Sequence, residues 1–152
     1  MNNSTSYWLK KGIHNGMPIA LGYLAVSFTL GIAAKNAGLT ALQAALASIT
    51  CHASAGEFAG FTLIAALAAY TEIAVMELII NARYFLMSCA LSQKLDNKMP
   101  FFHRLIMGLF VTDEIFGLTV SVPEKLNPAY IYGMVLVASP AWVLGTYFGV
   151  LF

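Results

Sequence analysis

Hydrophobic residues form long uninterrupted stretches in this chain, and its few charged residues separate them. A helix that crosses the hydrocarbon core of a bilayer needs about 20 predominantly apolar residues. Lys11 and Lys35 enclose 23 uncharged residues, which is enough for one crossing helix. Divided in this way, the chain is predicted to form membrane-embedded segments over residues 17–34, 39–56, 58–71 (short or re-entrant), 72–93, 105–121 and 129–151. The predicted fold is therefore an all-α, polytopic bundle of membrane helices, formed by a single transmembrane domain of residues 1–152.

Residues 54–60 interrupt the second apolar stretch with small and polar side chains around Gly56 and Glu57. Non-helical backbone at membrane depth is tolerated only where protein or a water-filled cavity satisfies its amide and carbonyl groups. Broken or re-entrant helix pairs of this kind recur in secondary transporters, where helix N-termini face the substrate. Alternatively, Gly56 and Gly60, four residues apart, let two helices pack closely. Both interpretations are kept at this stage.

The distribution of lysine and arginine favours one orientation, because cytoplasmic loops carry an excess of these residues. If residues 39–71 cross the membrane an even number of times, five basic residues (Lys10, Lys11, Lys94, Lys98 and Arg104) lie on one side and two (Lys35 and Lys125) on the other. A single crossing would give three against four. We therefore expect a re-entrant pair or a full hairpin over 39–71, with the N-terminus and Phe152 in the cytoplasm.

The composition supports the same class of protein. Hydrophobic residues make up 59% of the chain and charged residues 10%, whereas a soluble domain carries about 25% charged residues. The formal net charge of +1 gives no electrostatic footprint for nucleic acid. Cys51 and Cys89 both fall inside apolar stretches, so we expect small buried side chains rather than a disulfide. The expected surroundings are the lipid bilayer, with no nucleic-acid partner.

Three charged residues inside the apolar stretches are the first candidates for function. Arg83 lies within residues 77–88, and the adjacent Asp113 and Glu114 lie within residues 105–122. A charge at the bilayer centre costs about 2.5–3.5 kcal/mol on insertion scales, so such charges are retained when they are paired or face a water-filled cavity. We expect one acid to pair with Arg83 and the other to face a substrate or relay a proton. A purely structural ion pair between two helices is the alternative.

Further polar residues share one face of the segment 72–93. Helical spacing places four of them along one stripe: Glu77, Asn81, Tyr84 and Ser88. Such a stripe lines a cavity or joins helices by hydrogen bonds. Glu77 is therefore a candidate proton carrier, with an interhelical carboxylate as the alternative.

The sequence lacks the motifs of intramembrane enzymes that we considered. It has no His-Glu-x-x-His zinc motif and no Gly-x-Ser-x-Gly nucleophile motif, and His52 has no second metal ligand at a useful spacing. We therefore expect a protein that is not an enzyme, with no catalytic residues, no metal and no cofactor.

Four stretches of the chain resemble one family of transport proteins: residues 12–22 (GIHNGMPIALG), 53–59 (ASAGEFA), 81–86 (NARYFL) and 112–116 (TDEIF). They are similar to the AzlC-type branched-chain amino acid exporters, the large subunits of two-component permeases. The resemblance runs from about Gly12 to Gly149, and the Asn-x-Arg-Tyr and Thr-Asp-Glu motifs are its most specific part. Family members usually have glutamine where this chain has Glu57, and they extend well past its length. The chain is thus expected to be the N-terminal part of a longer permease.

The resemblance implies export of valine, leucine, isoleucine and methionine across a bacterial inner membrane. The export would be driven by the proton gradient and would require a small AzlD-type membrane subunit. The expected substrate-binding residues are Gly56, Glu57, Phe58, Asn81, Arg83, Asp113 and Glu114, and the proton-coupling candidates are Glu57, Glu77, Asp113 and Glu114. Two other functions are alternatives: proton-coupled export of small hydrophobic cations, and a membrane scaffold that transports nothing.

Overall fold

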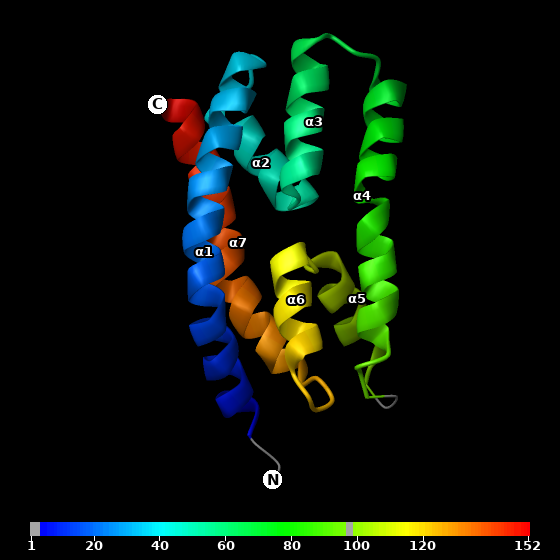
Figure 1. Ribbon diagram of the computed structural model, residues 1–152. Helices are drawn as coiled ribbons and strands as arrows, with labels where there is room; N and C mark the ends of the chain where they lie inside the picture. The colour runs from blue at the N-terminus through cyan, green and yellow to red at the C-terminus, as the bar shows by residue number, and fades with distance from the viewer. Residues whose placement is uncertain (1–3, 97–98) are drawn as a thin grey trace. The chain divides into compact units, whose positions relative to one another are not determined.

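The computed structural model describes residues 4–96 and 99–152, and the regular structure in these ranges is helical throughout (Figure 1). The helices described are α1 (Thr5–Asn36), α2 (Ala41–Cys51), α3 (Ser54–Ala65), α4 (Tyr70–Ser92), α5 (Phe101–Leu109), α6 (Asp113–Ser121) and α7 (Pro128–Leu151). Among them α1, α4 and α7 are long and apolar enough to cross a bilayer. The predicted all-α fold with membrane-spanning helices is confirmed.

The chain divides into two compact units, and each of the three long helices contributes to both. Unit 1 contains the described residues of 1–19 and 83–138, and unit 2 contains residues 20–82 and 139–152. Unit 2 therefore includes α2 and α3 whole, whereas unit 1 includes α5 and α6 whole. Each unit thus combines two short helices with parts of α1, α4 and α7.

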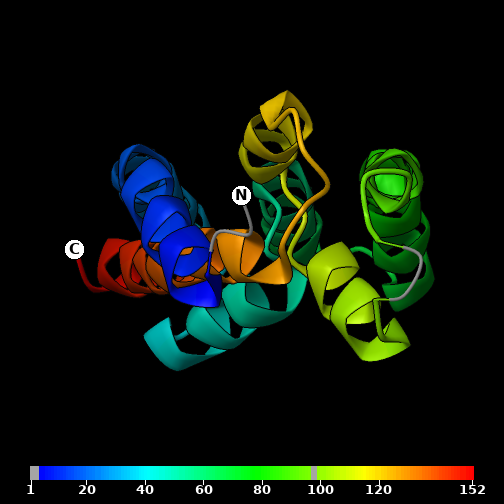
Figure 2. The same ribbon diagram turned by 90° about the horizontal axis from the view of Figure 1, so that it is seen from below.

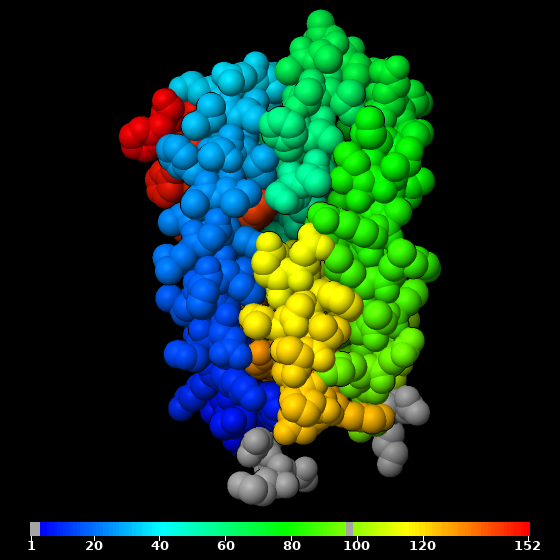
Figure 3. All heavy atoms as spheres, in the orientation of Figure 1, coloured from blue at the N-terminus to red at the C-terminus, as the bar shows by residue number. Residues whose placement is uncertain are grey.

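The surface of α4 is strongly apolar, and its atoms are green in Figure 3. No residue of its most apolar 18-residue stretch is buried. Leu78, Ile79, Phe85 and Leu86 are among its exposed side chains. A helix that exposes apolar side chains in this way suits contact with lipid or with further membrane helices.

In unit 2, α2 and α3 form an antiparallel pair that is joined by a sharp break (Figure 1). A capping box starts α2, in which Thr40 Oγ1 accepts from the Gln43 amide and the Gln43 side chain accepts from Thr40 N. The helix ends at Cys51, its capping residue His52 has left-handed backbone (φ 47°), and Ala53 is extended before α3 begins. The 11 and 12 residues of these helices extend about 16 and 18 Å, too short for a membrane crossing. The chain is therefore broken between α2 and α3, at His52 and Ala53, but the predicted position of the break is wrong, because Gly56 lies inside α3.

The predicted continuous helix over residues 105–121 is wrong, because the chain forms α5 and α6 on either side of residues 110–112. Thr112 has extended backbone, and its Oγ1 accepts a hydrogen bond from Ile115 N, so it caps the start of α6. A Thr cap followed by two acids is a strong signal for a helix start. Asp113 and Glu114 are therefore first-turn residues of α6 and do not lie in the middle of a long helix. In unit 1, α5 lies beside the C-terminal part of α4 (Figures 1 and 2).

Glycines allow α1 and α7 to approach closely within each unit. In unit 1, a Cβ on Gly12 would clash with the carbonyl of Tyr130. In unit 2, a Cβ on Gly31 would clash with the carbonyl of Thr146, and one on Gly149 would clash with that of Phe28. Small residues of this kind are the usual device for close packing of membrane helices.

Candidate functional site

Glu57 lies in the first turn of α3 and is buried, with only 2% of its residue surface exposed. Its Oε2 lies 2.8 Å from Ser48 Oγ of α2, and its Oε1 accepts a hydrogen bond of 2.5 Å from Trp142 Nε1 of α7. Ser48 and Trp142 are themselves buried. Three helices of unit 2 therefore meet at this carboxyl group, and their donors replace the water that burial removes.

The hydrogen-bonded contacts continue from Ser48 to α7. Ser48 Oγ lies 2.7 Å from Thr146 Oγ1, which in turn lies 3.3 Å from the carbonyl oxygen of Trp142, one helical turn earlier. Both hydroxyl residues are fully buried. We refer to Ser48, Glu57, Trp142 and Thr146 as the Glu57 cluster.

Glu77 and Asn81 of α4 lie against the glycine face of α3. Asn81 Nδ2 donates a hydrogen bond of 2.8 Å to Glu77 Oε2. A Cβ on Gly56 would lie 2.7 Å from Glu77 Oε2 and 3.0 Å from Asn81 Nδ2, and one on Gly60 would lie 3.0 Å from Glu77 Oε1. Gly56 and Gly60 thus make room for polar side chains of the neighbouring helix, which favours close helix packing as their role.

Asn81 also carries a buried acceptor with no hydrogen-bond partner in the part of the chain that the structure describes. This acceptor is Oδ1, while Nδ2 of the same amide is bonded to Glu77. A buried polar atom without a hydrogen-bond partner destabilises a protein by about 1–3 kcal/mol. A ligand that donates a hydrogen bond to this oxygen would remove that cost. A free acceptor beside a carboxylate is the arrangement that binds a cationic N–H group.

In unit 1, Arg83 of α4 forms a salt bridge with Asp113 of α6. Arg83 Nη1 lies 3.0 Å from Asp113 Oδ2, and the two side chains are 42% and 43% exposed. Arg83 Nη2 also donates to Tyr84 Oη at 3.1 Å, and the guanidinium lies over the Tyr84 ring. The predicted pairing of Arg83 with one of the two adjacent acids is confirmed, while its role stays a prediction.

The predicted site residues therefore form two groups, one in each unit. Gly56, Glu57 and Asn81 belong to unit 2, with Glu77 beside them, whereas Arg83, Asp113 and Glu114 belong to unit 1. Phe58 is 57% exposed on α3, and Glu114 is exposed in the first turn of α6. The aromatic ring of Phe58 is thus outside the buried Glu57 cluster.

Three members of the Glu57 cluster were not predicted from the sequence. Trp142 and Thr146 lie four residues apart and so share one face of α7, which is the only signal that links them. Ser48 is one of several hydroxyl residues in apolar segments. Its partner on α7 lies 98 residues away in the chain, so local spacing could not identify it.

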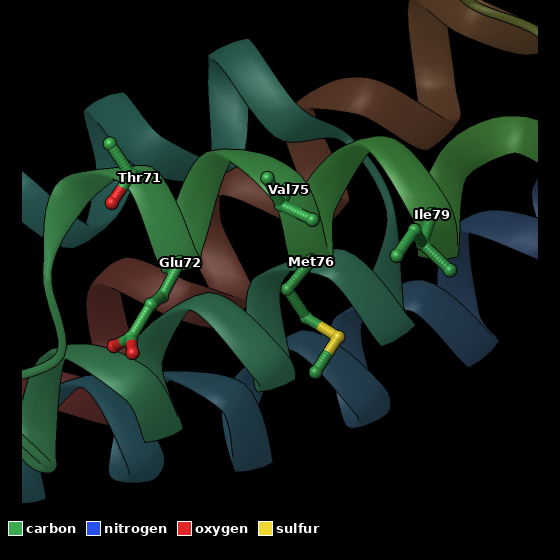
Figure 4. A pocket seen from close by; sticks show the side chains of 5 residues that line it. All are labelled: Thr71, Glu72, Val75, Met76 and Ile79. Atoms are coloured by element: carbon green, nitrogen blue, oxygen red, sulfur yellow. The ribbon is translucent and has the colours of Figure 1, made fainter.

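A shallow groove of about 380 Å³ runs along the first half of α4 and is lined by Thr71, Glu72, Val75, Met76 and Ile79 (Figure 4). The carboxylate of Glu72 already accepts a hydrogen bond of 3.1 Å from Ala69 N at the start of the helix. Apart from Thr71 and Glu72, the side chains that line the groove are apolar. Within residues 4–96 and 99–152, no group of three His, Cys, Asp or Glu residues could hold a metal ion.

Comparison with known proteins shows several relatives. The chain is 34% identical over 148 residues to an uncharacterized membrane protein of Archaeoglobus fulgidus, covering 97% of this chain and 64% of that protein. It is 22% identical over 143 residues to the inner membrane protein YgaZ of Escherichia coli, covering 91% and 58% respectively. An uncharacterized membrane protein of Helicobacter pylori is 25% identical over 144 residues, with 92% and 62% covered. The chain thus spans about three-fifths of the length of these relatives, and no solved structure matches it.

The family described as AzlC protein matches residues 18–152, which include α2 to α7 and most of α1. This match covers the Glu57 cluster, the Glu77–Asn81 pair and the Arg83–Asp113 salt bridge. The chain therefore belongs to the AzlC family of membrane proteins.

Proposed function

We propose that this chain forms part of a proton-coupled exporter of valine, leucine, isoleucine and methionine in a bacterial inner membrane. Membership of the AzlC family and three helices suited to membrane crossing support a transporter. We propose this activity for a protein of the length of the relatives, acting with a small AzlD-type membrane subunit. A free hydrophobic amino acid needs an acceptor for its ammonium group, donors for its carboxylate and an apolar surface for its side chain.

The Glu77–Asn81 pair is the observation that carries the proposal. Asn81 Oδ1 is a buried acceptor that no described residue satisfies, and the carboxylate of Glu77 is hydrogen-bonded to the same amide. An ammonium group has three N–H donors, which a carboxylate and an amide oxygen can share. Charge-assisted hydrogen bonds of this kind are stronger than neutral ones. We therefore place the substrate ammonium beside Asn81.

The first turn of α3 is the proposed position of the substrate carboxylate. No side chain caps the helix at Ala53, and the amide groups of an uncapped first turn attract anions together with the helix dipole. Because Gly56 has no Cβ, the side chains of Glu77 and Asn81 can lie against this same turn. The two charged ends of one amino acid could therefore be bound by groups that lie next to each other in unit 2.

With the ammonium assigned to Glu77 and Asn81, we propose separate roles for the other candidates. Phe58 contacts the substrate side chain in unit 2, whereas Arg83, Asp113 and Glu114 contact substrate or protons within unit 1. The Arg83–Asp113 salt bridge is more than one-third exposed at both ends, and a charge pair in a membrane segment needs water or further protein around it. A water-filled path for substrate or protons would supply that environment. The exposed ring of Phe58 offers an apolar surface to a substrate side chain.

Chain order and helix lengths lead us to propose a revised membrane topology. If α1, α4 and α7 each cross once, and the α2–α3 and α5–α6 pairs each return to the side from which they entered, the basic residues divide six to one. By their place in the sequence, Lys10, Lys11, Lys94, Lys98, Arg104 and Lys125 are then cytoplasmic and Lys35 is external. This bias is stronger than the five to two of the first topology. The revised topology keeps the N-terminus in the cytoplasm but places Phe152 outside.

Competition between substrates tests the proposed function against its alternatives. Vesicles that contain the protein and its partner subunit would be loaded with labelled leucine, and efflux would be measured with an excess of valine or of a lipophilic cation inside. We expect valine to slow leucine efflux and the cation to have no effect. Competition by the cation alone would favour a cation exporter, and the absence of any flux in well-inserted protein would favour a scaffold.

A further inference from the structure

The Glu57 cluster contains three short oxygen–oxygen contacts, but its two hydroxyl groups have only two hydrogens to donate to them. Glu57 Oε2 lies 2.8 Å from Ser48 Oγ, Ser48 Oγ lies 2.7 Å from Thr146 Oγ1, and Thr146 Oγ1 lies 3.3 Å from the Trp142 carbonyl oxygen. Each contact needs one hydrogen, and each hydroxyl group supplies one. The indole hydrogen of Trp142 is already directed at Glu57 Oε1. A neutral carboxylic acid at Glu57 supplies the missing hydrogen, and all three contacts are then satisfied.

The same positions also serve an ionised carboxylate, with the hydroxyl groups turned round. Thr146 then donates to Ser48, and Ser48 donates to Glu57. Only the longest contact, from Thr146 to the Trp142 carbonyl, loses its hydrogen. The Trp142 indole donates to Oε1 in both states. Protonation of Glu57 therefore requires the rotation of two hydroxyl hydrogens and no movement of heavier atoms.

No lysine or arginine in residues 4–96 or 99–152 forms an ion pair with Glu57. The titratable groups around the cluster in unit 2 are Cys51 and His52 from α2, Glu77 from α4 and Tyr23 from α1, while α7 contributes no charged residue there. A carboxylate in a protein interior is costly unless a cation or several donors compensate it. A proton is the cation that this cluster is built to accept.

We propose that Glu57 binds and releases the coupled proton, and that Ser48, Thr146 and Trp142 are positioning residues that stabilise both protonation states. The inference rests on the proposed proton-coupled export and assigns the proton to one of the four candidate carboxyl groups. Because family members usually have glutamine at this position, the assignment concerns this chain and not the family. Uptake converts the carboxylate to a carboxylic acid, with hydronium as the donor and water as the product, and release reverses this step. Only O–H bonds are formed or broken.

Infrared difference spectroscopy of the purified, lipid-reconstituted chain tests the proposal without any transport. Between alkaline and acidic buffer, the wild type should gain a carbonyl band of a buried carboxylic acid. Glu57→Gln should lack this band, because an amide does not take up the proton. The amide can still donate to Ser48 and accept from Trp142, so the variant preserves the cluster. Glu77→Gln and Glu124→Gln, the latter an exposed loop residue, should retain it. Trp142→Phe should move the band to higher wavenumber, because the carbonyl oxygen loses its donor, and Ser48→Ala should also shift it.

The outcomes separate this inference from the proposed function. A band that persists in Glu57→Gln, or that disappears only in Glu77→Gln, would overturn the assignment of the proton to Glu57. A band that does not move in Trp142→Phe and Ser48→Ala would overturn the positioning roles. If the Glu57 band is present and responds as described while leucine efflux ignores the pH gradient, proton binding stands and proton-coupled export fails. Proton-driven efflux that is unchanged in Glu57→Gln would contradict the inference and leave the exporter intact.

Discussion

Glu57 Oε1 and Trp142 Nε1 lie 2.5 Å apart, so one hydrogen bond between buried groups joins α3 to α7 in unit 2. Glu57→Leu has a similar volume but leaves the indole N–H without an acceptor, which costs about 1–3 kcal/mol. Glu57→Gln retains an acceptor, so we expect it to lose less than about 1 kcal/mol. The free energy of unfolding in detergent, measured by denaturant titration for both variants, checks this difference. Equal stabilities would show that the contact contributes nothing.

Gly56→Ala should damage unit 2, because the added Cβ would lie 2.7 Å from Glu77 Oε2 and 2.9 Å from Cys51 Sγ. Overpacking costs about 1–3 kcal/mol, and we expect the lower end of this range because the atoms that the Cβ meets are side-chain ends that can move. Gly22→Ala in α1 is the matched control, since a Cβ there meets nothing within 4 Å, and alanine is the better helix former. Thermal unfolding of the two variants should show a lower midpoint for Gly56→Ala and an unchanged or higher one for Gly22→Ala. The reverse order would refute the packing role of Gly56.

Asn81→Leu should weaken leucine binding, because it removes the unpaired acceptor proposed for the substrate ammonium. A hydrogen bond to a charged group is worth about 1.5–3 kcal/mol, which corresponds to roughly a 10- to 100-fold rise in Kd. Asn15→Leu removes an amide that is bonded to Tyr130 in unit 1 and serves as a control with unchanged affinity. Equilibrium binding of labelled leucine measures both. Unchanged affinity in Asn81→Leu would remove this residue from the substrate site.

Asp113→Asn should abolish export while the protein still reaches the membrane. The side chains of the Arg83–Asp113 salt bridge are 42% and 43% exposed, and a pair of this kind that faces water contributes at most about 1 kcal/mol to stability. A loss of transport without a loss of stability would therefore reflect function. The double variant Arg83→Gln with Asp113→Asn separates the roles, because it also removes the unpaired cation. Recovery of export in the double variant would mean that the pair is only structural.

The revised topology predicts which loops face the outside of the cell. In a background with Cys51 and Cys89 replaced by serine, single cysteines would be placed at Leu67, in the α3–α4 loop, and at Glu124, in the α6–α7 loop. Leu67 is 93% exposed, and Glu124 is also exposed. A membrane-impermeant maleimide added to intact cells should label position 67 and not position 124. Labelling of position 124 would contradict the topology.

Hydropathy predicted the long helices because a helix that crosses a membrane needs about 20 consecutive apolar residues, and such stretches are rare in other structures. The segments 72–93 and 129–151 agree with α4 and α7 to within two residues at each end. The segment 17–34 lies inside α1, which begins earlier, at Thr5. The start of α1 was missed because its first turns contain Lys10 and Lys11. A search for uncharged stretches stops at these lysines, although lysine is compatible with a helix.

The short helices show what hydropathy could not predict. Residues 105–121 are apolar enough for one helix, but Thr112 provides a local cap that ends the continuity. Reading Thr112 and its following acids as a helix start would have identified this break. The Glu57 cluster is harder to predict, because Thr146 can bond to a carbonyl of its own helix. Only the three-dimensional structure shows that it also contacts Ser48.

Leucine efflux across an imposed pH gradient tests the central proposal most directly. Vesicles that contain the complete protein would be loaded with labelled leucine, with and without the AzlD-type subunit, and efflux would be followed before and after a protonophore collapses the gradient. We expect efflux that needs the partner subunit and falls when the gradient is lost. Leucine efflux at the same rate with and without the gradient would contradict this proposal.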